Sequence, residues 1–199
     1  MVTVASAELV VTWALTGALA ATLIYCAMRR HEKSAPSPWR TLAQVLTTAA
    51  LFAALAWRLG WSIVLLAPSW LAATGVALAA IDLRSRRLPN RLVLPSYLAI
   101  PGLAAATVLN GTDSTALIRA TLGMTSVLIC YGLLYAVFPG HLGGGDLKLA
   151  GPIGFLLAWQ GWSALLTGTL LTWVLATLAL PLSSATWHRT GGSSLPLGP

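Results

Sequence analysis

The chain has 199 residues, of which 57% are hydrophobic and only 9% are charged, whereas soluble domains carry roughly 25% charged residues. This composition excludes a soluble globular protein and predicts an integral membrane protein. The net charge of +7 does not indicate a nucleic-acid-binding protein, because the basic residues lie in the gaps between apolar runs and do not form one solvated basic face.

Seven apolar runs follow one another along the chain, and a bilayer core needs about 20 apolar residues per helix. The runs are Leu9–Met28, Leu42–Trp57, Trp61–Ile81, Leu92–Leu109, Ala116–Phe138, Leu147–Trp159 and Trp162–Leu182. Leu147–Trp159 is short for a span, so we expect it to be tilted or sunk into the protein. The pattern predicts an all-α, polytopic membrane helix bundle with six or seven spanning segments.

The basic residues predict the orientation of the bundle. No basic residue precedes Leu9, whereas Arg29 and Arg30 follow Met28, which is the reverse of the order in a signal peptide. If the helices alternate in direction, all twelve basic residues except Arg58 and Arg119 fall on one side. The positive-inside rule makes that side the cytoplasm, which places the N-terminus outside and the C-terminus inside.

We expect residues 1–182 to form a single transmembrane domain. Residues 183–199 are rich in Ser, Gly and Pro, and this composition predicts a disordered cytoplasmic tail. The predicted location is a cell membrane, which the chain crosses several times.

Two of the five acidic residues stand apart from the other three. Glu8, Glu32 and Asp113 fall in predicted loops or at predicted helix ends, where we interpret them as solvated charges. Asp82 directly follows the third apolar run and Asp146 directly precedes the sixth, so both lie at the same predicted cytoplasmic boundary. Two carboxyl groups at one depth can share a proton and activate a water molecule. At this point, two unrelated helix-end residues explain the positions equally well.

The residues that flank the two aspartates form two motifs. Asp82 is followed by five residues and then by Leu88-Pro89-Asn90, and the stretch from Gly143 to Leu149 reads GGGDLKL, a match to GxGDxKL. Both motifs, in this order and about sixty residues apart, resemble the type IV prepilin peptidases, the A24 family of GxGD-type membrane aspartic proteases. The resemblance covers residues 70–182.

The resemblance implies an activity and a set of site residues. Asp82 and Asp146 would be the catalytic aspartates of an endopeptidase that cleaves the basic leader of a type IV pilin-like precursor, at the cytoplasmic face of a prokaryotic cell membrane. The implied partners are that precursor, with its basic leader and hydrophobic helix, and the lipid bilayer. The accompanying motif residues, to which we assign the substrate approach, are Gly143, Gly145, Lys148, Leu88, Pro89 and Asn90.

The cysteine content differs from that of the larger family members. Those members carry two CxxC pairs in a zinc-binding element that is linked to N-methylation of the trimmed pilin. This chain has two cysteines, Cys26 and Cys130, and each lies inside an apolar run. A structural zinc site needs about four nitrogen or sulfur ligands. We therefore expect no metal, no cofactor and no methyl transfer.

Three expectations concern the residues around the two aspartates. The glycines before Asp146 should allow positive φ and a close approach of the substrate. Lys148 should either pair with Asp146 or extend toward the lipid headgroups. Asp146 should lie at a helix N-cap, where its ionised form is favoured, and Asp82 should lie at a helix C-terminus, where its protonated form is favoured. Asp146 would then be the base that activates water.

Two non-enzymatic functions remain open from the sequence. One is a transporter or channel component, since acidic residues within a membrane mark ion paths, although no acidic residue falls at mid-bilayer here. The other is a pilus-assembly factor without catalytic activity. A presenilin-like protease is disfavoured, because the chain contains no Pro-Ala-Leu motif.

Overall fold

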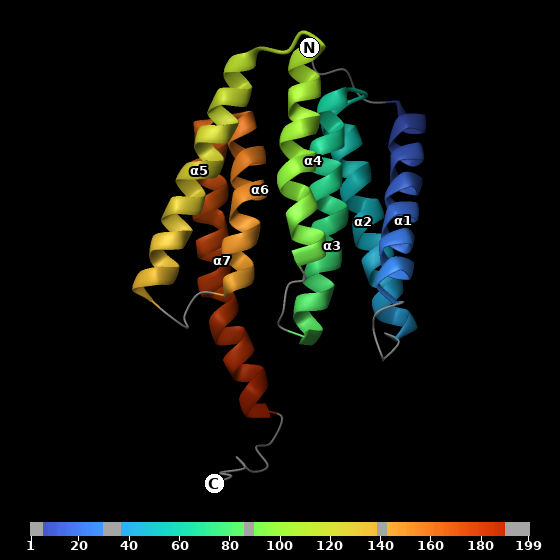
Figure 1. Ribbon diagram of the computed structural model, residues 1–199. Coiled ribbons are helices and arrows are strands. Elements are labelled where there is room, and N and C mark those ends of the chain that lie inside the picture. Colours follow the sequence, from blue (N-terminus) through green and yellow to red (C-terminus); the bar gives the residue numbers. More distant parts are fainter. Residues whose placement is uncertain (1–5, 30–36, 86–89, 139–142, 190–199) are drawn as a thin grey trace.

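Seven α-helices and one short 3-10 helix form the part of the chain that the structure, a computed structural model, describes (Figure 1). The described residues are 6–29, 37–85, 90–138 and 143–189. In chain order the elements are α1 (Ala7–Arg29), α2 (Pro38–Leu59), η1 (Ile63–Leu65), α3 (Leu66–Ser85), α4 (Asn90–Leu109), α5 (Ser114–Val137), α6 (Gly144–Gln160) and α7 (Trp162–Arg189). No strand occurs in these ranges, and the predicted all-α fold is confirmed.

The chain is a multi-pass membrane protein. Helices α1 to α5 each contribute most of one of five segments that are long and apolar enough to cross a membrane. Helix α6 has 17 residues and is about 25 Å long at 1.5 Å per residue, which is less than the roughly 30 Å of a hydrocarbon core. Helix α7 contributes a further apolar segment, Trp162–Leu175. That α6 and α7 also cross the membrane therefore stays a prediction.

Two helix boundaries differ from the expected runs. The third run does not begin as an α-helix, because Gly60 ends α2 with a positive φ of 64° and the 3-10 helix η1 precedes α3. Helix α7 continues to Arg189, past Leu182, where we expected a tail to begin. Residues 190–199 lie outside the described part of the chain, so the disordered tail stays a prediction.

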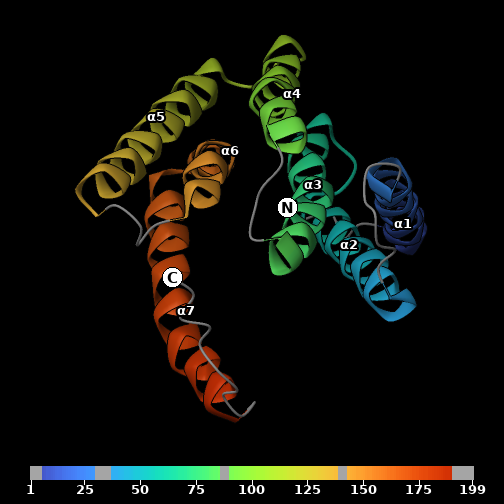
Figure 2. The ribbon, with the colours of Figure 1, turned by 60° about the horizontal axis from the view of Figure 1, so that its bottom comes forward.

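The helices alternate in direction, so that α1 begins and α7 ends at opposite ends of the bundle (Figure 1). Which end faces the cytoplasm stays a prediction. Viewed obliquely, α6 lies between α5 and α7 on one side and α3 and α4 on the other (Figure 2). Helix α6 contacts both sides, and it therefore joins the two parts of the bundle.

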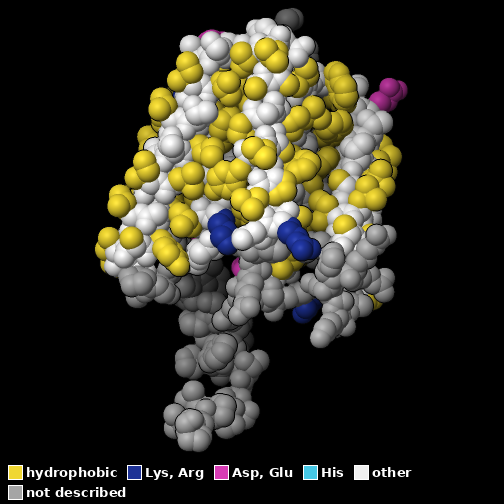
Figure 3. All heavy atoms as spheres, viewed as in Figure 1, with side chains coloured by type: hydrophobic (Ala, Val, Ile, Leu, Met, Phe, Trp, Pro, Cys, Tyr) yellow, Lys and Arg dark blue, Asp and Glu magenta, His cyan; other side chains and the backbone are white. Residues whose placement is uncertain are grey.

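The surface of the bundle is apolar around most of its height. Leu15, Leu98 and Leu133, on three different helices, are each at least 60% exposed. Figure 3 shows hydrophobic side chains over the visible face, with Lys and Arg side chains near its lower edge. A monomeric soluble protein rarely exposes apolar patches of more than a few hundred Å². This surface is suited to lipid tails, and the charged lower edge to a membrane boundary.

The best-packed core lies where α3, α4, α5 and α6 meet, toward the end at which α3 begins and α6 ends. Its buried residues are Ala67, Ile100, Ala104, Ala120 and Phe155. Phe155 also stacks on Trp159, with ring centroids 6.4 Å apart. This packing holds α6 against both neighbouring groups of helices at that end.

Arg119, one of the two exceptions to the predicted charge distribution, has a structural role. Its Nε donates to the carbonyl oxygen of Ala158 at 2.8 Å, and its Nη2 donates to that of Trp159 at 2.7 Å. These carbonyls belong to the last turn of α6, where four backbone acceptors lack helical partners. A guanidinium at a helix C-terminus also complements the helix dipole. Arg119 therefore caps α6, which gives a physical reason for its position.

Candidate active site

The two motif aspartates lie at the same end of the bundle, on different helices. Asp82 is in the last turn of α3, and Asp146 is in the first turn of α6. Figure 1 shows α3 ending and α6 beginning at the lower end, which we call the aspartate end. The negative charge of Asp82 raises the pKa of Asp146, so the carboxyl groups are close enough to interact. Asp82 is exposed.

The glycines before Asp146 do not have the backbone conformation that we expected. Gly143 is the N-cap of α6 with φ −66° and ψ 131°, and Gly144 and Gly145 already belong to the helix. Among the described glycines, positive φ occurs only at Gly60, Gly111 and Gly161. The expectation of positive φ at this motif is therefore wrong.

Gly143 instead makes room for the side chain of Asp146. A Cβ atom at Gly143 would lie 3.0 Å from Oδ2 of Asp146, which is closer than most real contacts. The Asp146 carboxylate turns back over the N-cap and accepts the backbone N–H of Gly143. This is the second half of a capping box, in which the third helical residue reaches back to the N-cap N–H. Asp146 is thus the third residue of α6 and not its N-cap.

Asp146, which lies outside the five candidate spans, has a raised pKa. Partial burial is the main cause, the negative charge of Asp82 raises the pKa further, and the Gly143 N–H opposes both. The helix-dipole argument predicted the opposite direction, and that prediction is wrong. Burial disfavours the charged form of a carboxyl group, and here it outweighs the favourable helix terminus.

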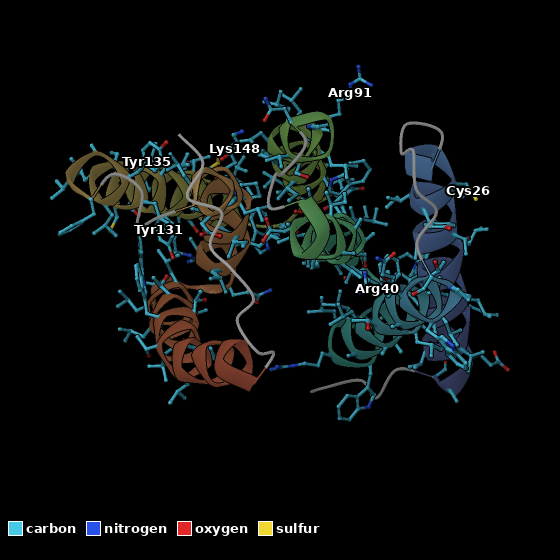
Figure 4. All side chains as sticks on the ribbon, turned by 90° about the horizontal axis from the view of Figure 1, so that it is seen from below. Cys26, Arg40, Arg91, Tyr131, Tyr135 and Lys148 are labelled. Atoms are coloured by element: carbon cyan, nitrogen blue, oxygen red, sulfur yellow. The ribbon has the colours of Figure 1, made fainter. Side chains whose placement is uncertain are left out.

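Lys148 contacts the first motif, and this was neither of its two expected interactions. Its Nζ donates to Oδ1 of Asn90 at 2.8 Å, and Asn90 is the first residue of α4. Figure 4 shows Lys148 from the aspartate end, where it lies among α4, α5 and α6. The Leu-Pro-Asn and GxGDxKL motifs are therefore joined by a direct hydrogen bond between side chains.

A second contact between α4 and α6 lies beside this bond. The hydroxyl of Tyr97 donates to the backbone oxygen of Lys148 at 2.8 Å. A Cβ at Gly151 would lie 2.6 Å from the same hydroxyl oxygen, so only glycine fits there without a shift. Tyr97 was not predicted as a site residue. Its spacing of seven residues from Asn90 places both on one face of α4, which is the signal that could have identified it.

A pocket of about 250 Å³ lies next to Asp146, between α5, α6 and α7. Its walls include Tyr131 of α5, Ile153 of α6 and Trp173 of α7. The rings of Tyr131 and Trp173 are 6.0 Å apart at a tilt of 40°, and Figure 4 shows Tyr131 on the side of α5 that faces α7. The sequence did not predict this pocket, because nothing local indicates that these helices meet.

Three further expectations have different outcomes. Leu88 and Pro89 lie outside the described residues. Cys26 and Cys130 are exposed and unpaired on α1 and α5. The described residues contain no group of three metal-ligating side chains, while the absence of a metal or cofactor from the protein stays a prediction.

Comparison with known proteins identifies the family. Residues 65–182, more than half of the chain, match the model of the type IV leader peptidase family. The chain belongs to the type IV leader peptidase family. The matched region includes both aspartates, the Asn90–Lys148 bond and the pocket beside Asp146. The resemblance inferred from the two motifs is therefore confirmed.

One curated relative gives a more specific comparison. The chain is 33% identical over 115 residues to a prepilin leader peptidase/N-methyltransferase of Bacillus subtilis (strain 168). The aligned region is 58% of this chain and 44% of that relative, so the chain covers less than half of the relative's length. No solved structure gave a significant match.

Proposed function

We propose that the chain is a membrane aspartic endopeptidase that removes the basic leader of type IV pilin-like precursors at the cytoplasmic face of the cell membrane, without N-methyltransferase activity. The observation that carries this proposal is the position of Asp82 and Asp146 at one end of the bundle (Figure 1), in the last turn of α3 and the first turn of α6. Membership of a leader peptidase family supports it. The position of both residues at a boundary of the apolar surface suits a cut just before a hydrophobic helix.

The raised pKa of Asp146 suggests how the pair divides the work. In the proposed mechanism, Asp146 holds the proton of the pair at the start of the reaction. Asp82 accepts a proton from water as the oxygen attacks the scissile carbonyl carbon, and Asp146 donates its proton to the carbonyl oxygen. When the tetrahedral intermediate collapses, Asp146 regains a proton from a hydroxyl. Asp82 protonates the leaving amine as the C–N bond breaks.

The test is cleavage of a pilin-like precursor by the purified full chain in lipid. Asp82→Asn and Asp146→Asn should each abolish cleavage without loss of fold or insertion. The matched control is Asp113→Asn at the N-cap of α5, where Asp113 accepts the N–H of Thr115 at 3.0 Å. Asn caps a helix about as well as Asp, so this variant should cleave like the wild type.

The outcomes separate the enzymatic from the non-enzymatic functions. Substantial cleavage by either site variant would remove that aspartate from the mechanism. If the wild-type chain leaves the precursor intact, the peptidase proposal fails, and a transporter component or a non-catalytic assembly factor becomes the better explanation.

A further inference from the structure

A groove of about 700 Å³ lies away from the two aspartates, between α1 and α4. Both helices contact α3, but within the described residues they do not contact each other (Figure 2). The groove is therefore open toward the membrane between α1 and α4, with α3 behind it. Neither Asp82 nor Asp146 is among its lining residues. The proposed peptidase activity leaves this groove without a role.

The hydroxyl and indole N–H groups of the groove wall already donate to acceptors within the protein. The indole nitrogen of Trp13 donates to the hydroxyl of Ser69 at 3.0 Å, and that of Trp70 donates to the hydroxyl of Ser96 at 3.2 Å. The lining hydroxyls donate to backbone oxygens three or four residues earlier; they belong to Thr16, Ser69 and Thr74. The wall therefore offers a ligand apolar contact.

One end of the groove carries a positive charge. Arg91, in the first turn of α4, is the one charged residue among the lining residues that the structure describes, and it is exposed. Figure 4 shows it at the aspartate end, extending outward from α4. The lining residue of α4 farthest from Arg91 is Leu103, twelve residues along the helix, which is about 18 Å at 1.5 Å per residue. One leaflet occupies roughly half of a hydrocarbon core of about 30 Å, so the groove has the length of a lipid tail.

An anionic phospholipid matches both features of the groove. Its acyl chain fits an apolar wall, and a guanidinium group binds a phosphate with two parallel hydrogen bonds. Basic pockets between membrane helices are sites for anionic headgroups. The hydrophobic helix of a precursor matches less well, because its basic leader would lie beside Arg91 and like charges repel.

We propose that the groove between α1 and α4 binds one anionic phospholipid, with its phosphate on Arg91 and an acyl chain against Ala20 and Trp70. The bound lipid would fill the space between two helices that have no direct contact. It would thereby join α1 to the part of the bundle that carries α4.

Native mass spectrometry of the full chain in a neutral detergent tests the headgroup site. The probes are phosphatidylglycerol, which is anionic, and phosphatidylcholine with the same acyl chains. The wild type should bind phosphatidylglycerol about fivefold more tightly, because one basic residue near an anionic headgroup contributes about this factor. Arg91→Gln should lose the preference. The matched control is Arg40→Gln, which removes an exposed arginine at the same end, in α2 and outside the lining, and should keep it.

A second pair of variants tests the acyl-chain site. Ala20→Phe places a ring in the groove and should abolish the retention of either lipid. Ala27→Phe adds the same ring at an exposed position of α1 outside the lining, and it should bind lipid like the wild type.

Four results would overturn the lipid site. They are equal affinities of the wild type for the two lipids, an unchanged preference in Arg91→Gln, unchanged retention in Ala20→Phe, and an equal loss of retention in Ala20→Phe and Ala27→Phe. A photoreactive residue in the hydrophobic helix of a precursor that crosslinks to α1 and α4 within the groove would identify the precursor as the occupant instead. A dimer that Ala20→Phe dissociates would identify a second copy of the chain.

Discussion

Lys148 and Asn90, which are 58 residues apart in the sequence, are joined by a hydrogen bond of 2.8 Å between Nζ and Oδ1. Lys148 lies two residues after Asp146 in α6, and Asn90 is the first residue of α4. The bond therefore fixes the turn of α6 that carries Asp146 against the start of a neighbouring helix.

A double-mutant cycle should measure this coupling. Asn90→Leu and Lys148→Met each remove the bond, so their effects on the free energy of unfolding should be less than additive by about 0.5–1.5 kcal/mol. Asn90→Asp, which keeps an acceptor for the ammonium, should retain most of the stability. Additive effects of the two single substitutions would show that the bond contributes nothing measurable.

Gly151→Ala should separate α4 from α6. Its Cβ would lie 2.6 Å from the Tyr97 hydroxyl oxygen, and overpacking of this kind costs about 1–3 kcal/mol. Unfolding in detergent should show a lower free energy of unfolding for Gly151→Ala. Adding Tyr97→Ala to the same chain should restore part of that free energy. The control is Gly132→Ala in α5, where the added Cβ would meet nothing within 4 Å. A stable single variant without the relieving substitution would contradict the close approach.

Arg119→Met should destabilise the end of the bundle that lies opposite the aspartates. The substitution removes two hydrogen bonds from a charged group to the last turn of α6, and we expect a loss of about 1.5–3 kcal/mol in the free energy of unfolding. Arg58→Met is the comparison, since Arg58 is exposed in the last turn of α2. Similar small losses in both variants would argue against a capping role for Arg119.

Asp82→Asn should lower the pKa of Asp146, because it removes a negative charge that helps to raise that pKa. Infrared difference spectroscopy of the carboxyl stretch should follow the titration in the wild type and the variant. The raised pKa favours the protonated carboxyl in the folded chain, so its contribution to stability is present at low pH and is lost as pH rises through the folded pKa. In the proposed mechanism cleavage needs the Asp146 proton, so the cleavage rate should fall over the same increase in pH. An unchanged or higher pKa in Asp82→Asn would contradict the electrostatic coupling.

The trimmed pilin should keep an unmethylated N-terminal amine when this chain acts alone. The expectation comes from the two cysteines, which are unpaired and lie on separate helices, where a zinc site would need about four ligands. Mass spectrometry of the product, made with purified chain and a methyl donor, should show no added methyl group. The full-length relative, a prepilin leader peptidase/N-methyltransferase, is the positive control.

The sequence by itself determined that the chain lies in a membrane, where its helices run, and at which helix ends the two aspartates stand. Apolar runs and the charges between them are local features, and in a bilayer every backbone polar group must be satisfied within the chain, which makes helices the available structure here. Asp82 and Asp146 border the third and sixth runs, so alternation alone places them at one end. The two motifs then indicated the family before any contact was known.

Tertiary structure decided the contacts between helices and the direction of the Asp146 pKa. The partners Asn90 and Lys148, Tyr97 and Gly151, and Arg119 and Ala158 are distant in the sequence, and no periodicity within one helix identifies a partner on another. The dipole argument for Asp146 used only the residue's own helix, whereas its pKa depends on burial beside α5 and α7 and on a charge carried by α3. Burial and charge act on the Asp146 pKa through space, so the packing of the helices determines the direction of its shift.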